Sequence, residues 1–225
     1  TRRQDTNLEV FFLDTPAGPR FTTVTRPVGE PKGGWIYIHP FAEEMNKSRR
    51  MAALAARVLA KNGWLVLQID LCGCGDSTGE FGDATWQNWL DDITHAWEWL
   101  RNECQGVLGI WTLRAGSLLA ADWLKMTDNH LPLLLWQPVK SGQQHLVQFQ
   151  RLKAASEMLS ANSKGVVPKL RAELEAGQSV EVAGYTISSE LSEGLGKSRL
   201  QLPKNYRGAV TLLEIVGDDR QEASP

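Results

Sequence analysis

The stretch Trp111-Thr112-Leu113-Arg114-Ala115-Gly116-Ser117 decides the fold. It follows a short apolar run at 107–111 and opens a segment with helical patterning at 115–126. A strand that turns sharply into a helix, with small residues two positions before and two after the vertex, is the pattern of a nucleophile elbow. The vertex residue then projects from the carboxyl edge of a sheet, at the amino end of the helix. Here that residue is Arg114.

Arginine at the vertex removes the usual chemistry of this turn. Enzymes built on it place Ser, Cys or Asp there, whereas a guanidinium stays protonated and has no lone pair for attack. The alternative nucleophile is Ser117, out of register, but it lies three residues into the helix rather than on the strained turn. Thr112, at the first small position, also departs from the usual Gly.

Other short apolar runs flank the elbow, at 34–39, 64–69 and 131–136. Continuous apolar runs are typical of strands buried on both faces, as in a parallel sheet covered by helices. Two runs nearer the amino terminus, 9–13 and 21–25, are separated by a Pro/Gly turn and predict a hairpin. The alternation of strand and helix signals therefore predicts an α/β fold with a mostly parallel sheet and helices on both faces.

Two helices of this core are predicted from capping residues and apolar spacing. We expect the first to begin at a Ser48 cap and to stop at Gly63. Thr85 caps the second. The predicted apolar stripes are Met51, Leu54, Ala55, Val58 and Leu59 in the first helix, and Trp86, Trp89, Leu90, Ile93, Trp97 and Leu100 in the second.

A long segment interrupts the alternation. Roughly 70 residues separate Trp136 from the next apolar run, at 209–216, which is too long for a plain loop. Patterns within it predict helices near 143–160, 168–175 and 189–195 and a strand at 180–183. We therefore expect a mainly helical cap at 137–206, inserted into a core made of 1–136 and 207–225. Because the chain reaches Pro225 before the final strand and helix of such a core, we expect its C-terminal end to be incomplete.

Two loops at the same sheet edge carry further candidate residues. His39-Pro40-Phe41 ends a predicted strand where related enzymes place an oxyanion loop. Pro40 has no N–H, so an oxyanion hole would need the backbone amides of Phe41 and Ala115. We interpret His39 as a structural histidine rather than a base. Asp70-Leu-Cys-Gly-Cys-Gly-Asp-Ser77 has glycines that let a loop turn, and Thr78 in place of a third Gly rules out a dinucleotide fingerprint.

Four segments together resemble one known family, the hydrolase 2 family associated with the exosortase A system of bacterial exopolysaccharide and protein-sorting loci. The segments are 39–50, 70–81, 109–116 and 183–191. The resemblance covers nearly the whole chain and implies an α/β-hydrolase fold and a hydrolase of ester or thioester substrates. Arg at the elbow belongs to the pattern of this family, so the family name does not by itself supply a nucleophile.

The remaining members of a catalytic triad are incomplete. An acid is expected after the last strand, where Asp218 or Asp219 is the candidate. A histidine should follow it, yet none occurs after His145, which lies inside the predicted cap. Ser-His-Asp catalysis is therefore not supported, and whether the chain is an enzyme stays open.

The positive charge of Arg114 opposes the dipole of the helix that it precedes, so it needs compensation. One source is an internal carboxylate, from Glu43, Glu44, Asp218 or Asp219. The other is an anionic ligand bound beneath the cap through the planar guanidinium. We expect a pair with Glu43 or Glu44 in the unliganded protein.

Two functions remain after these steps. The first is a hydrolase with a degenerate triad, in which the Glu43/Glu44 pair or the Asp218/Asp219 pair supplies a general base that activates a water, with Glu44 as the candidate base or partner of Arg114. The second is a non-catalytic binding protein that recognises an anionic ligand, or a protein partner of an exosortase pathway, through Arg114.

A formal net charge of −2 over 225 residues disfavours a nucleic-acid binder. No apolar stretch is long enough to span a membrane, no spacing predicts a metal or cofactor site, and three cysteines without a disulfide pattern favour the cytoplasm.

Overall fold

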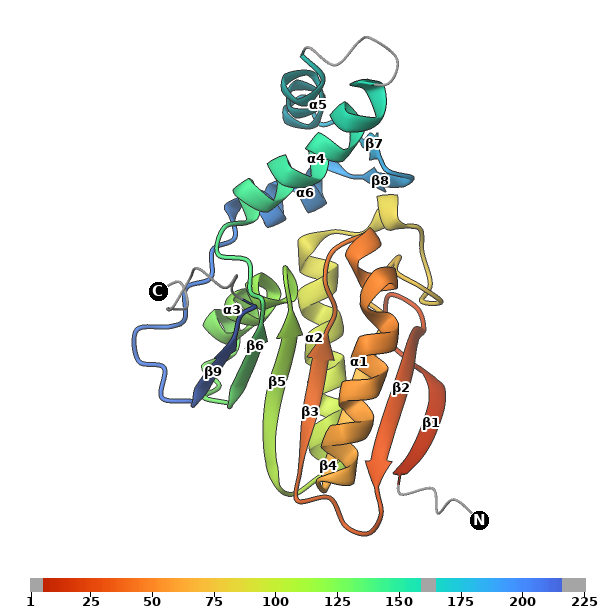
Figure 1. The fold of residues 1–225 in the computed structure, drawn as a ribbon, viewed down its shortest axis with the longest axis vertical. Coiled ribbons are helices and arrows are strands. Elements are labelled where there is room, and N and C mark those ends of the chain that lie inside the picture. Colours follow the sequence, from red (N-terminus) through yellow and green to blue (C-terminus); the bar gives the residue numbers. More distant parts are fainter. Residues whose placement is uncertain (1–5, 159–164, 216–225) are drawn as a thin grey trace.

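The centre of the fold is a seven-stranded sheet, built from the residues that the computed structural model describes, 6–158 and 165–215. The strand order is β1-β2-β4-β3-β5-β6-β9 (Figure 1). β1 and β2 form the predicted hairpin, β2 is antiparallel to β4, and every later pairing is parallel. The bounds are β1 Thr6–Leu13, β2 Arg20–Pro27, β3 Gly33–Ile38, β4 Trp64–Ile69, β5 Val107–Leu113, β6 Leu133–Trp136 and β9 Val210–Leu213. The predicted mostly parallel sheet is confirmed.

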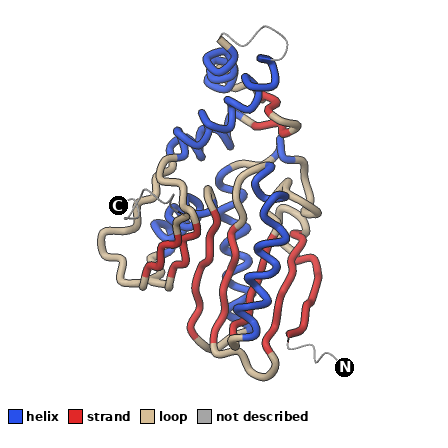
Figure 2. The backbone as a smooth tube through the Cα atoms, viewed as in Figure 1, coloured by secondary structure: helices blue, strands red, loops and turns tan. Residues whose placement is uncertain are grey.

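Helices cover both faces of the sheet, as predicted. α1 (Glu43–Lys61) packs on one face, and α2 (Trp86–Glu103) and α3 (Gly116–Thr127) pack on the other (Figures 1 and 2). Because strand side chains alternate between faces, Tyr37 and Trp111 lie on the α1 side. Ile36 and Ile38 belong to the larger core on the α2 and α3 side.

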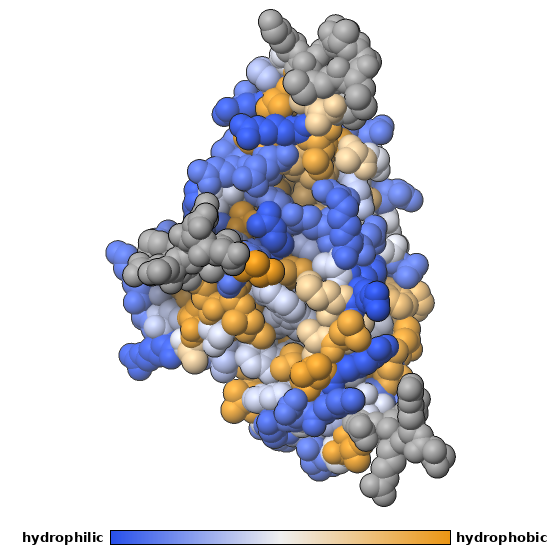
Figure 3. Space-filling view, viewed as in Figure 1, coloured by the Kyte–Doolittle hydropathy of each residue, from blue (hydrophilic) through white to orange (hydrophobic). Residues whose placement is uncertain are grey.

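The prediction for α1 is wrong in its start and in its buried stripe. The helix begins at Glu43 rather than at Ser48, and its buried residues are Met45, Ala52, Ala56 and Ala60. Acidic residues in the first turn suit a helix start, and Ser48 lies within the helix, where its Oγ donates to the Met45 carbonyl. The large rings of Tyr37 and Trp111 fill the space below the helix, so alanines pack against them. Of the predicted stripe, Ala55 and Leu59 are partly buried, whereas Leu54 and Val58 are 49% and 59% exposed. Figure 3 shows apolar side chains among polar ones on this face.

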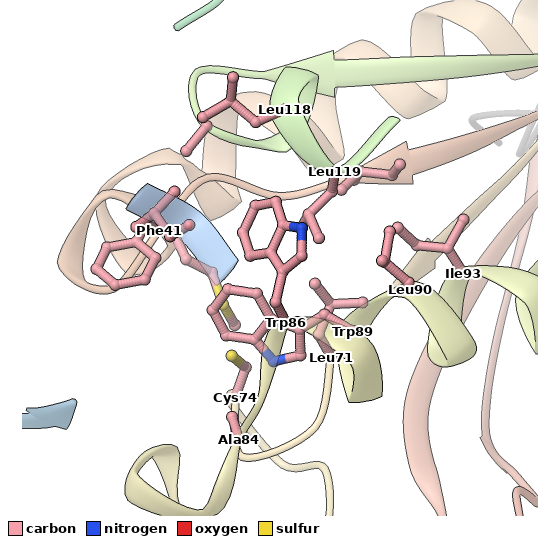
Figure 4. Close-up of a cluster of buried hydrophobic side chains, with 14 of the residues drawn as sticks. Phe41, Leu71, Cys74, Ala84, Trp86, Trp89, Leu90, Ile93, Leu118 and Leu119 are labelled. Carbon is pink, nitrogen blue, oxygen red and sulfur yellow. The ribbon is translucent and has the colours of Figure 1, made fainter. Parts of the chain in front are cut away.

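The prediction for α2 is confirmed. Thr85 Oγ1 accepts from the Asn88 amide at 3.0 Å, and the whole predicted stripe is buried. Trp86 and Trp89 join Phe41 and Leu119 in a cluster next to the elbow (Figure 4). The hydrophobic core therefore extends to the sheet edge next to the turn that carries Arg114.

The elements between β6 and β9 lie beyond the carboxyl edge of the sheet (Figure 1). We call the described residues 142–158 and 165–197 the cap segment. It contains α4 (Gly142–Met158), α5 (Val166–Glu175), β7 (Val180–Val182), β8 (Tyr185–Ile187) and α6 (Ser189–Lys197). β8 was not predicted, because it is short and pairs with β7 through a two-residue turn in which Ala183 and Gly184 both have positive φ. Across the described parts of the chain, each helix is too short or too polar to cross a membrane.

Candidate functional site

The backbone of the elbow has the predicted sharp turn. Arg114 has φ +52°, a left-handed conformation that costs a non-glycine residue about 1–2 kcal/mol. At position 116 a β carbon would lie 2.5 Å from the Ile38 carbonyl oxygen, so only glycine lets α3 approach β3 this closely. β5, the turn and α3 therefore present the Arg114 side chain at the sheet edge.

The charge of Arg114 is compensated within the protein. Its Nε donates to Glu44 Oε1 at 3.2 Å, and both side chains are about one-third exposed. Glu44 lies in the first turn of α1, and the neighbouring Glu43 is 3.8 Å from Lys47 Nζ. The guanidinium that occupies the vertex is thus held by a carboxylate from a different helix.

Ser117 is fully buried and occupied by backbone partners. Its Oγ lies 2.8 Å from the Arg114 carbonyl and 3.1 Å from the Val139 carbonyl, either of which can accept its proton. It also accepts from the Val139 amide at 3.2 Å. This hydroxyl ties the elbow to the segment after β6 and is not presented to a substrate.

His39 has a backbone partner on each ring nitrogen. Nε2 accepts from the Leu71 amide at 3.3 Å, so Nδ1 carries the proton and donates to the Pro40 carbonyl at 2.8 Å. Burial lowers the pKa of this ring and keeps it neutral. His39 fixes the loop after β3 against the loop after β4 and has no nitrogen left to act as a base.

His145 lies beside the elbow, although the sequence places it in the cap segment. Only 5% of the residue is exposed, and neither ring nitrogen has a hydrogen-bond partner among the described residues. Burial, together with the positive charge of Arg114, lowers the pKa of the ring to about 4. One signal could have found it: His145 lies in the first turn of α4, the helix that follows β6 at the same sheet edge.

The polar groups at the elbow meet in one cavity of about 190 Å³, which we call the elbow pocket. It is lined by Phe41, Glu43, Glu44, Arg114, His145, Gln148, Phe149 and Leu152. The structure thus brings together four residues that the sequence singled out and adds His145. His39 and Ala115 instead border a separate space of about 10 Å³ walled by Trp86 and Trp89, which is at the lower limit of the room that one water needs.

Comparison with solved structures identifies the architecture. The ferulate-bound esterase Est1E from Butyrivibrio proteoclasticus superposes with a TM-score of 0.60 at 15% identity, over 84% of this chain and 72% of that one. A soluble variant of monoglyceride lipase from Saccharomyces cerevisiae gives 0.58 at 16% identity, over 88% and 69%. A hydrolase from Agrobacterium vitis S4 gives 0.55 at 15% identity, over 93% and 90%. The chain has an α/β-hydrolase fold.

Sequence comparison adds nothing to this assignment, since no family model and no curated protein matches the chain. In the α/β-hydrolase fold the elbow vertex normally carries the nucleophile, and in this chain it carries an ion-paired arginine. The candidate acids Asp218 and Asp219 lie outside the described residues. Within residues 6–158 and 165–215 no cluster of His, Cys, Asp and Glu is arranged to hold a metal ion.

Proposed function

We propose that this α/β-hydrolase-fold protein binds a small molecule in the elbow pocket and forms no covalent intermediate. The observation that carries the proposal is the ion pair between Arg114 and Glu44 at the vertex. A protonated guanidinium cannot attack a carbonyl carbon. Ser117 and His39 support the same conclusion. The Ser117 hydroxyl and both His39 ring nitrogens already have backbone hydrogen-bond partners, so these side chains are not free to act as nucleophile or base.

The biological setting of the proposal comes from the resemblance. Four segments that include the elbow resemble the exosortase A-associated hydrolase 2 family, which supports a role in that bacterial system. The three cysteines without a disulfide pattern support a place in the cytoplasm. In this setting the elbow pocket would recognise a metabolite, and the cap segment would take part in that recognition through α4.

Reaction with a serine-directed fluorophosphonate probe, together with turnover of short-chain nitrophenyl esters and acyl thioesters, tests the proposal. We expect no labelling and no turnover above buffer. Labelling that disappears in Ser117→Ala would contradict it, because it would make Ser117 a reactive nucleophile. A known serine esterase in the same assay is the positive control.

A second candidate function is hydrolysis by an activated water. It is favoured by Glu44 Oε2, which is buried and has no hydrogen-bond partner among the described residues. Such a carboxylate oxygen can take a proton from a water that attacks an ester or thioester. Ester hydrolysis that survives Arg114→Ala but is lost in Glu44→Ala would support this candidate over the binding function.

A further inference from the structure

The elbow pocket contains a set of buried polar atoms that the protein leaves unpaired. In the described chain, both nitrogens of His145, together with Oε2 of Glu43 and Oε2 of Glu44, are buried without a hydrogen-bond partner. A buried polar group without a partner loses its hydration and gains nothing in return. These three residues come from two different helices, α1 and α4, and line the same cavity. Their convergence points to a ligand.

The unpaired atoms require partners of both kinds. The two carboxylate oxygens accept hydrogen bonds only, and a neutral imidazole has one accepting and one donating nitrogen. Arg114 uses Nε for Glu44, and the rest of its guanidinium can only donate. A carboxylate or phosphate ligand would satisfy the donors but not the glutamates, and an ammonium ligand would do the reverse. Hydroxyl groups both donate and accept, so they can satisfy every group.

The charges in the pocket favour a neutral ligand. Arg114 pairs with Glu44, and Glu43 lies 3.8 Å from Lys47. His145, whose pKa is low, adds no charge near neutral pH. With Lys47, which lies outside the pocket lining, the formal charges sum to zero, and an anion would bring an uncompensated charge close to two carboxylates.

Apart from the exposed Gln148, the remaining walls are apolar. Phe41 and Phe149 meet edge to face with ring centroids 5.2 Å apart, and Leu152 is 40% exposed at the rim. Aromatic and aliphatic walls suit the C–H surface of a ring whose edge carries polar groups. A volume of about 190 Å³ equals that of roughly six water molecules in the liquid, which suits one substituted six-membered ring.

We propose that the elbow pocket binds a neutral, hydroxyl-rich ring compound, with His145, Glu43 and Glu44 as its hydrogen-bonding partners. This inference rests on the proposed binding function and adds the class of ligand. It also gives His145, from the cap segment, the role of a specificity-determining residue.

Ligand-observed saturation-transfer NMR on the whole chain tests the class. The probes share one ring size: myo-inositol and methyl α-D-glucopyranoside carry hydroxyls, cyclohexanecarboxylate carries only an acceptor group, and cyclohexylammonium only a donor group. We expect transfer to at least one polyol and binding at least tenfold weaker for the carboxylate and the ammonium. Transfer should disappear in His145→Phe, which puts an apolar ring in the pocket, and in His145→Ala, which removes both nitrogens without adding bulk. Gln144→Ala, at the exposed neighbouring position, is the matched control and should bind as the unmodified protein does.

Other outcomes overturn the inference. If the carboxylate or the ammonium binds more tightly than both polyols and His145→Phe abolishes that binding, the ligand class is wrong while the binding function stands. If saturation transfer to every probe is the same in both His145 variants as in the unmodified protein, the pocket is not the site we infer. The proposed function fails separately, through covalent labelling by the fluorophosphonate or through ester turnover.

Discussion

Two histidines at the same sheet edge are equally buried but differ in their hydrogen bonding. His39, after β3, and His145, in α4, are each 5% exposed, and burial lowers the pKa of both rings. His39 has a backbone partner on each nitrogen, whereas His145 has none within the described structure. Burial and titration therefore do not separate a structural histidine from a ligand-binding one. The presence or absence of hydrogen-bond partners on the ring nitrogens does separate the two kinds of histidine.

The same contrast extends to the neighbouring side chains. On the core side, Ser117 is as completely partnered as His39. On the pocket side, one buried oxygen of Glu43 and one of Glu44 have no hydrogen-bond partner among the described residues. At the elbow, where this fold normally carries its nucleophile, Ser117 is held by backbone contacts, whereas His145, Glu43 and Glu44, which carry unpaired buried atoms, line the elbow pocket. Substitutions on either side test this division.

The largest effect is expected for His39→Phe. The substitution removes the acceptor of the Leu71 amide and the donor to the Pro40 carbonyl, leaving two buried backbone groups unpaired. We expect the free energy of unfolding to fall by about 3–4 kcal/mol, measured by urea denaturation at pH 7.5. A loss below about 1 kcal/mol would show that His39 does not have the structural role assigned here.

The contribution of His145 to the pH dependence of stability should appear as the difference between the unmodified protein and His145→Phe. Its pKa is about 4 in the folded protein against an ordinary 6.5, so between these values the unfolded chain binds more protons and acidification lowers the free energy of unfolding. From pH 7 to pH 4 the unmodified protein should lose up to about 3 kcal/mol more than His145→Phe does. His39 titrates in both proteins, so its contribution cancels in the difference. Parallel stability curves for the two proteins would contradict the prediction.

Ser117→Ala tests the structural role of the buried hydroxyl. The Val139 amide would lose its Ser117 acceptor but keep a longer contact of 3.3 Å with the Arg114 carbonyl. We therefore expect a loss of only about 1 kcal/mol in unfolding free energy, read from chemical denaturation. Binding of the polyol probes should be unchanged, and a loss of binding without a loss of stability would place Ser117 in the site instead.

The ion pair at the vertex should contribute little to stability. Arg114 and Glu44 are about one-third exposed, so solvent screens their attraction. A double-mutant cycle of Arg114→Gln and Glu44→Gln should give a coupling energy below about 1 kcal/mol. Both single variants should nevertheless weaken polyol binding. A coupling above about 2 kcal/mol would mean that the pair is mainly a structural element.

The local parts of this architecture were predictable from the sequence. The turn around Arg114 has its signature in neighbouring residues, and Thr85 marks the start of α2 by itself. The stripe of α1 was not predictable from spacing, because the Tyr37 and Trp111 rings of the sheet decide which helix face can be buried. An apolar period alone cannot show that alanines fit where leucine and valine do not.

The candidate site was predictable only in part. Arg114 and its carboxylate neighbours stood out because a cation at the vertex needs a partner. His145 did not, since its place beside the elbow depends on how α4 returns over the sheet edge. That juxtaposition is a tertiary contact between residues far apart in the chain, and its one sequence signal is the place of His145 in the first turn of the helix after β6.

His145→Phe, compared with His39→Phe, tests most directly the claim that His145 belongs to a ligand site. His145→Phe removes two ring nitrogens that have no hydrogen-bond partner among the described residues, and places an apolar ring in the contact with Phe41. In urea denaturation at pH 7.5, beside His39→Phe, we predict that its free energy of unfolding stays within about 0.5 kcal/mol of the unmodified protein or rises by up to about 1 kcal/mol. A loss of about 2 kcal/mol or more would show that His145 supports the fold as His39 does, and would contradict its assignment to a ligand site.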